Sequence, residues 1–124
     1  MENNDFNAQF DPNDVEQNKV LSLFAYIGIL FLIPLLAAPN SGYARFHANQ
    51  GLVLFLADIV GGIIIGVFTG ILTVAGGLIG LTIAGIISGI IGLCIFVFMI
   101  LGIVNAVTGK AKELPVIGKI RILK

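Results

Sequence analysis

The fold is decided by residues 51–107, which read GLVLFLADIVGGIIIGVFTGILTVAGGLIGLTIAGIISGIIGLCIFVFMILGIVNAV. Asp58 is the only charged side chain in these 57 residues. A charged residue at the centre of a membrane helix costs roughly 2.5–3.5 kcal/mol to insert, so a stretch without charges indicates entry into lipid. One helix over this stretch would be about 85 Å long, whereas two spans fit a bilayer core of about 30 Å.

Adjacent glycines at Gly76 and Gly77 mark the expected break between these two spans, because glycine allows a tight reversal. We expect spans over about 51–75 and 78–107, closed by Thr108 and Gly109. A second uncharged stretch, about 20–38, would be about 28 Å long as a helix and is expected to form the first span. The predicted fold is an all-α, polytopic transmembrane bundle with three spanning helices and a glycine-rich hairpin. Four spans are the alternative.

Composition and charge divide the chain into three parts. The 124 residues are 57% hydrophobic and 11% charged, whereas soluble domains carry about 25% charged residues. We expect a flexible acidic tail over 1–19, a transmembrane domain over 20–108 and a basic interfacial tail over 109–124. Lys and Arg beside a span favour anionic lipid as a partner. A basic stretch this short does not indicate nucleic-acid binding.

The distribution of Lys and Arg predicts the orientation. With three spans, Arg45 and the basic tail lie on the same side, which the positive-inside rule places in the cytoplasm. The N-terminus is then outside the cell membrane. The turn over 39–42 separates the first two helices, and Ser41 is suited to cap the second.

Small residues recur at four-residue spacing in two rows. Residues four apart share one helix face, and small side chains there let two backbones approach closely in lipid. We expect the rows to pack against each other within the hairpin, and a pore-lining or oligomerising face is the alternative. The rows are Gly62, Gly66 and Gly70, and Gly76, Gly80, Ala84, Ser88 and Gly92.

Two further polar features lie near or within the spans. Asp58 is an intramembrane acid and therefore a functional-site hypothesis, and a protonated or water-bonded carboxyl near the interface is the alternative. A polar collar is expected at the cytoplasmic level, formed by Arg45, His47, Asn49, Gln50, Asn105 and Thr108. His47 is the single histidine, and no catalytic-triad or metal-ligand spacing accompanies it. The sequence therefore predicts neither an enzyme nor a cofactor.

Three stretches resemble a known family: YIGILFLIP (26–34), ARFHANQGL (44–52) and GKAKELPVIGK (109–119). They are similar to small bacterial membrane proteins related to the membrane subunit of the chloroplast inner-envelope import translocon (Tic). The resemblance implies a multi-pass bacterial membrane protein. The motif residues that it implies are Arg45, Phe46, His47, Ala48, Gln50, Gly51, Gly109, Lys110, Leu114, Pro115 and Gly118.

These observations lead to one functional prediction and two alternatives. The leading hypothesis is a non-enzymatic multi-pass membrane protein, a translocon-like or accessory subunit that acts through helix–helix partners or self-association. The first alternative is a small oligomeric channel or holin-like pore. The second is a protein that anchors to the lipid surface.

Overall fold

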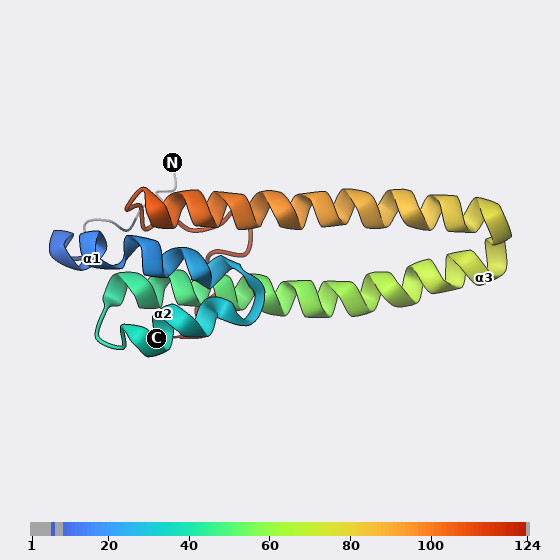
Figure 1. The fold of residues 1–124 in the computed structure, drawn as a ribbon. Coiled ribbons are helices and arrows are strands. Elements are labelled where there is room, and N and C mark those ends of the chain that lie inside the picture. The colour runs from blue at the N-terminus through green and yellow to red at the C-terminus, as the bar shows by residue number, and fades with distance from the viewer. Residues whose placement is uncertain (1–5, 7–8, 124) are drawn as a thin grey trace. The chain divides into compact units, whose positions relative to one another are not determined.

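The computed structural model describes residue 6 and residues 9–123. These residues form helices and turns, and none of them forms a strand. The predicted all-α class is therefore confirmed for the described part of the chain. The elements, in chain order, are α1 (Pro12–Leu23), the 3-10 helices η2 (Phe24–Tyr26) and η3 (Gly28–Phe31), α2 (Leu32–Ala37) and α3 (Gly42–Val107) (Figure 1).

The chain forms two compact units. Unit 1 contains the residues up to Phe55 together with those from Phe98 onward, and unit 2 is Leu56–Val97. Helix α3 begins and ends in unit 1, and its middle forms unit 2.

Helix α3 begins and reverses where the sequence predicts. The Ser41 hydroxyl oxygen accepts a hydrogen bond from the Ala44 N–H (3.0 Å), so Ser41 is the N-cap. Gly77 has φ 59° and ψ −135°, a non-helical conformation that glycine adopts without a Cβ clash. The chain reverses direction there (Figure 1). The expected break at Gly76 and Gly77 is confirmed.

The C-terminal end of α3 is closed by a glycine cap. Gly109 has φ 76°, its N–H donates to the Ala106 carbonyl (3.3 Å), and the Lys110 N–H donates to the Asn105 carbonyl (2.8 Å). This pair of bonds is a Schellman motif, which satisfies carbonyls that the helix end leaves unpaired. The expected closure after Thr108 is confirmed.

The first expected span, 20–38, is not one helix. Helix α1 ends at Leu23, and Ile27 (φ −111°, ψ 82°) and Gly28 (φ 54°) break the backbone between η2 and η3. The ten residues of η3 and α2 rise only about 15–17 Å, roughly half of a bilayer core. The three-helix bundle is therefore not found. Among the described residues, α3 alone is long and apolar enough to cross a membrane.

The N-terminal tail is helical over part of its expected flexible length. Asp11 caps α1 by accepting a hydrogen bond from the Asn13 N–H (2.9 Å), and Pro12 occupies the first helical position. Residues 12–19 therefore belong to α1, because cap and proline together favour a helix start. The rest of the expected tail includes residues 1–5, 7 and 8, which lie outside the described residues, as does Lys124.

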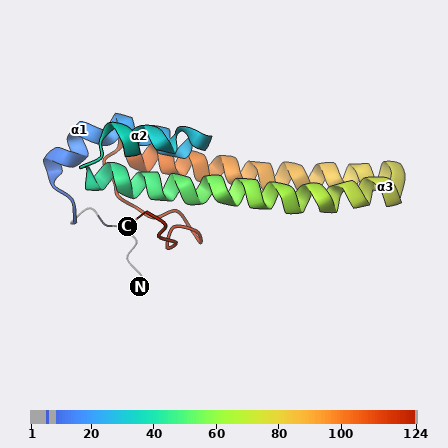
Figure 2. The same cartoon turned by 90° about the horizontal axis from the view of Figure 1, so that it is seen from below.

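Unit 1 packs three parts of the chain around both ends of α3. Helices α1 and α2 lie on one side of these ends, and the C-terminal segment, residues 108–123, lies on the other (Figure 2). The hydrophobic core joins η2, η3, both ends of α3 and the C-terminal segment through Ala25, Tyr26, Phe31, Leu54, Ala106 and Leu114. The expected interfacial tail is thus partly folded into the core, because Leu114 is buried there.

Phe6 and Asp14 connect the N-terminal segment to other parts of unit 1. The Phe6 N–H donates to the Ala111 carbonyl (2.8 Å), and the Tyr43 N–H donates to the Asp14 carboxylate (3.1 Å). A carboxylate at a helix N-terminus is favourable because the exposed N–H groups carry partial positive charge. The Phe6 bond brings the N-terminal segment to the start of the C-terminal segment.

Candidate functional site

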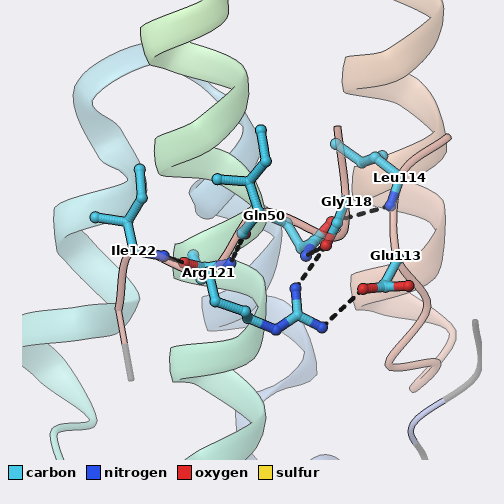
Figure 3. Close-up of polar contacts among 8 residues, drawn as sticks. Gln50, Glu113, Leu114, Gly118, Arg121 and Ile122 are labelled. Atoms are coloured by element: carbon cyan, nitrogen blue, oxygen red, sulfur yellow. Dashed lines mark hydrogen bonds and ion pairs between the residues drawn. The ribbon is translucent and has the colours of Figure 1, made fainter. Parts of the chain in front are cut away.

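The C-terminal segment is held on α3 by three polar residues of the ARFHANQGL stretch, His47, Asn49 and Gln50, which we call the polar clamp. Gln50 makes two hydrogen bonds through its buried amide group. Its Nε2 donates to the Gly118 carbonyl (2.9 Å), and its Oε1 accepts from the Leu114 N–H (2.9 Å). Gln50 thereby joins both ends of the turn that starts at Leu114 (Figure 3).

Asn49 holds the next part of the segment. Its Nδ2 donates to the Ile120 carbonyl (2.9 Å), and its Oδ1 accepts from the N–H groups of Ile122 (2.7 Å) and Leu123 (2.9 Å). The Asn49 side chain is buried. Because a buried amide without partners is costly, these three bonds fix residues 120–123 against α3.

His47 connects the clamp to the N-terminal helices. Its Nε2 lies 3.1 Å from the Lys110 carbonyl oxygen, and its Nδ1 lies within hydrogen-bond distance of the Tyr26 hydroxyl. A carbonyl can only accept, so Nε2 carries the proton and Nδ1 accepts from Tyr26. His47 thus uses both ring nitrogens to join α3, the C-terminal segment and η2.

Burial keeps His47 neutral. The side chain is fully buried, with its ring centroid 4.6 Å from that of Tyr43 and 5.3 Å from that of Phe46. This burial lowers the pKa of His47 to about 3, while the bond to the Lys110 carbonyl opposes the shift. A charged imidazolium would lose its hydration in this position. His47 therefore packs and orients other groups and is not poised to exchange protons near neutral pH.

An ion pair and two aromatic rings hold Arg121. Its guanidinium donates to the Glu113 carboxylate (2.8 Å) and to the Gly118 carbonyl (2.5 Å). The guanidinium carbon lies 5.4 Å from the ring centroids of both Phe6 and Phe46. The Glu113 side chain is 8% exposed and that of Arg121 is 35% exposed, so the carboxylate is buried while its partner still meets solvent. Figure 3 shows Arg121 reaching toward Glu113 beneath Gln50.

Tyr43 ties the start of α3 to its end. Its hydroxyl donates to the Ala106 carbonyl (2.8 Å) and approaches the Asn105 carbonyl (3.3 Å). Burial raises the pKa of Tyr43, so the hydroxyl stays protonated and can donate. The polar collar that the sequence predicts is partly assembled here. Asn105 contributes its backbone carbonyl, and the Thr108 hydroxyl bonds the Val104 carbonyl (2.6 Å).

Glycines in unit 1 allow close approaches that any side chain would block. A Cβ on Gly51 would lie 1.6 Å from the Ala25 carbonyl oxygen, and one on Gly102 would lie 2.1 Å from the Tyr26 ring. A Cβ on Gly118 would lie 2.4 Å from the Leu114 carbonyl oxygen. Gly51 and Gly118 therefore belong to the packing that the polar clamp secures.

The remaining motif residues have packing positions or lie at the surface. Ala48 is fully buried, and Phe46 is half-buried against Phe10. A Cβ added to Gly109 would lie 3.2 Å from side-chain atoms of Val15 and Lys19. Pro115 is exposed, and Arg45 lines a hollow described below. The two motif stretches, far apart in sequence, are thus brought together in unit 1.

The two rows of small residues are only partly in contact within unit 2. A Cβ on Gly80 would lie 1.8 Å from the Leu72 carbonyl oxygen, and Ala84 is buried. A Cβ on any of the other row glycines would meet nothing within 4 Å, and Ser88 is exposed; these glycines are Gly62, Gly66, Gly70, Gly76 and Gly92. The close approach that the sequence predicts along whole rows is therefore found only near the reversal.

The intramembrane acid Asp58 has one isolated oxygen. Its Oδ1 is buried without a hydrogen-bond partner, while the side chain as a whole is half-buried. Among the described residues, no group of three or more His, Cys, Asp or Glu side chains is placed to hold a metal ion. Both interpretations of Asp58 therefore stay predictions.

Sequence reasoning missed Tyr26 and the Arg121–Glu113 pair. Tyr26 is the one tyrosine in an otherwise apolar stretch, and a phenol there needs a partner, which was a usable signal. No local pattern identifies Arg121 as the partner of Glu113, because their pairing depends on how the turn between them folds.

The fold and the site define a class of protein. Helix α3 is apolar and almost uncharged, its surface is exposed over nearly its whole apolar length, and the charged groups gather in unit 1. These are the properties of an all-helical membrane protein.

A family model described as the magnetosome magnetite crystal formation protein family (MamF/MmsF) matches residues 17–123. The chain therefore belongs to the MamF/MmsF family. Comparisons with curated proteins and with solved structures found no match. The expected kinship with the Tic translocon subunit is wrong. Two of the three quoted stretches, 44–52 and 109–119, meet where the C-terminal segment is held on α3, which is a packing role.

Proposed function

We propose that this protein is a non-enzymatic membrane component of magnetite crystal formation that acts through unit 1. The family match over residues 17–123 carries the proposal, because the family description names that process. The structure supports a role in presenting a surface to partners. The hydrogen bonds and the ion pair within unit 1 hold its polar groups, and therefore its surface, in fixed positions. The channel and anchoring alternatives stay predictions, and no particular contact favours them.

The bonding of the titratable side chains supports a role without catalysis. His47 uses both ring nitrogens, Glu113 binds Arg121, and the carboxylate of Asp14 binds Ser41 and Tyr43. A general acid or base must reach a substrate proton within hydrogen-bond distance. These groups are committed to the protein's own backbone and side chains.

We infer that the chain crosses the membrane twice, over about 51–76 and 78–101. At 1.5 Å per residue these spans measure about 39 and 36 Å, enough for a core of about 30 Å. The α1–α2 hairpin would then enter the membrane only part of the way and return at Ile27 and Gly28. Backbone groups at that depth need partners within the protein, and the Ile27 N–H has one, since it donates to the Phe24 carbonyl (3.2 Å).

An even number of spans places both chain ends on one face. All seven Lys and Arg residues lie outside Leu56–Val97, and so does every acidic residue except Asp58. The positive-inside rule assigns this face to the cytoplasm. Partners that recognise charge, whether membrane proteins, a second copy or anionic lipid, would therefore meet unit 1 from the cytoplasmic side.

The topology is tested by fusing reporters to each end of the full chain. Both fusions should report the cytoplasm. Reporters on opposite faces would contradict the two-span arrangement and restore an odd number of spans.

The function is tested by deleting the gene in a magnetite-forming host and restoring it. We expect altered crystal size or number in electron micrographs after deletion, recovery with the wild-type gene, and poor recovery with a Gln50→Met variant present at wild-type level in the membrane. Unchanged crystals after deletion would contradict the proposed role.

A further inference from the structure

A hollow of about 340 Å³ opens on unit 1 beside the polar clamp. Three phenylalanine rings, two arginines and an exposed glutamine line it: Phe6, Phe10, Phe46, Arg45, Arg121 and Gln9. We propose that this hollow binds the headgroup of an anionic phospholipid. The proposal rests on the membrane placement given above and adds a ligand site to it.

Arg121 is held in one orientation and has N–H donors beyond those in its two hydrogen bonds. A guanidinium has five N–H donors, and among the described residues Arg121 bonds Glu113 and Gly118 through two of its nitrogens, at 2.8 and 2.5 Å. The flanking rings of Phe6 and Phe46, each 5.4 Å from the guanidinium carbon, restrict its movement. A fixed arginine with remaining donors is suited to phosphate, which it can bind through two parallel hydrogen bonds.

The aromatic wall favours a lipid over a free anion. The Phe10 ring lies 5.9 Å from Phe46 and 6.3 Å from Tyr43 in edge contacts, so an apolar surface adjoins the cation. A phosphodiester headgroup presents an anion attached to an apolar glycerol ester, which matches both parts of the hollow. Inorganic phosphate would match only Arg121 and gain nothing from the rings.

The position along α3 agrees with headgroup depth. Arg45 and Phe46 lie on the first turns of α3, before the inferred span begins at residue 51. Basic pockets on the cytoplasmic side of membrane helices are the usual places for anionic headgroups. The cation, the aromatic wall and the lipid phosphate would thus lie at one level.

An isosteric pair of variants tests the site. Gln9→Glu adds a negative charge inside the hollow, and Gln17→Glu adds the same charge on an exposed position of α1 outside it. The full-length proteins in detergent are mixed with phosphatidylglycerol and phosphatidylcholine, and bound lipid is counted by native mass spectrometry. Gln9→Glu should lower the preference for phosphatidylglycerol about fivefold, the factor expected for one charge. Gln17→Glu should match the wild type.

Two further measurements separate the possible outcomes. Arg121→Lys keeps the charge but removes the planar donor pair, so it should weaken phosphatidylglycerol binding while the protein keeps its helical circular dichroism. Added inorganic phosphate, at equal ionic strength, should not displace the lipid. Equal lipid preference in the two glutamate variants would overturn the proposal. Displacement by inorganic phosphate would also overturn it and would indicate a site for a free anion.

Discussion

Replacing Gln50 by Met should release the C-terminal segment from α3. The substitution keeps the side-chain size but removes both hydrogen bonds of the amide group. The Leu114 N–H would then be buried without its 2.9 Å partner, at a cost of about 1–3 kcal/mol. The Gly118 carbonyl loses the hydrogen bond from Nε2 of Gln50 but keeps the one from Arg121 at 2.5 Å. Its contribution to the loss of stability is therefore smaller. Together we expect about 2–4 kcal/mol.

A loss of this size is measurable as accessibility to trypsin after Lys119. Cleavage of a transiently open segment follows the population of the open form, so 2–4 kcal/mol corresponds to roughly 30- to 1000-fold faster cleavage. The matched control is Gln17→Met, at an exposed position on α1, which should cleave at the wild-type rate. If Gln50→Met also keeps the wild-type rate, the clamp does not secure the segment and the reasoning is wrong.

Four further variants test other parts of unit 1 and α3 through unfolding in detergent. Gly51→Ala should destabilise the protein by about 1–3 kcal/mol because its Cβ would lie 1.6 Å from the Ala25 carbonyl oxygen. Gly62→Ala, whose Cβ would meet nothing within 4 Å, should stabilise it by about 0.5–1 kcal/mol. Equal effects of the two variants would contradict the close contact at Gly51. Val116→Gly should stabilise by about 0.5–1 kcal/mol, since Val116 is 91% exposed with φ 67°, a strained conformation for a β-branched residue. The free energy of unfolding should fall as the pH drops from about 6.5 toward 3, because the pKa of His47 is depressed in the folded state and unfolding therefore takes up a proton there. The slope of this free energy against pH should exceed that of His47→Gln by up to about 1.4 kcal/mol per pH unit. Parallel pH profiles for the two proteins would contradict this.

The features of α3 could be predicted because their signals are local. Ser41 as N-cap, Gly77 at the reversal and Gly109 after the last turn each follow from the backbone preferences of one or two residues. Lack of charge over residues 59–109 predicts the apolar surface just as directly.

The N-terminal hairpin could not be read in the same way. Hydropathy over 20–38 is that of a span, and a single glycine in such a stretch is usually tolerated. Gly28 breaks the helix here because folding back brings Ala25 and Tyr26 against Gly51 and Gly102. That gain depends on residues far away in the sequence, so the length of the apolar run gave the wrong element.

The rows of small residues failed for a geometric reason. Each step of four residues turns by about 40° beyond a full turn of a helix, so a row of five drifts around the surface by about 160°. The buried and half-buried positions of the second arm within unit 2 instead mix steps of four and three; they are Gly80, Ala84, Ile87, Ile91 and Ile95. Two arms that run nearly parallel therefore share such a stripe, and Ser88 and Gly92 turn away from it.

The motif stretches identified residues that pack together in the structure, but they indicated the wrong protein family. The ARFHANQGL stretch and the GKAKELPVIGK stretch meet through His47, Asn49 and Gln50, so their spacing records a packing solution. Unrelated functions can share a packing solution, because function depends on the groups that a fold presents to its partners. Here those groups are the charges of the described part of unit 1, which lie on or beside α1, on the first turns of α3 and on the C-terminal segment, while the residues around Gly77 include apolar ones such as Val74 and Leu78. An influence of this protein on a crystal would accordingly be exerted from its charged face, through lipid or partner proteins bound there.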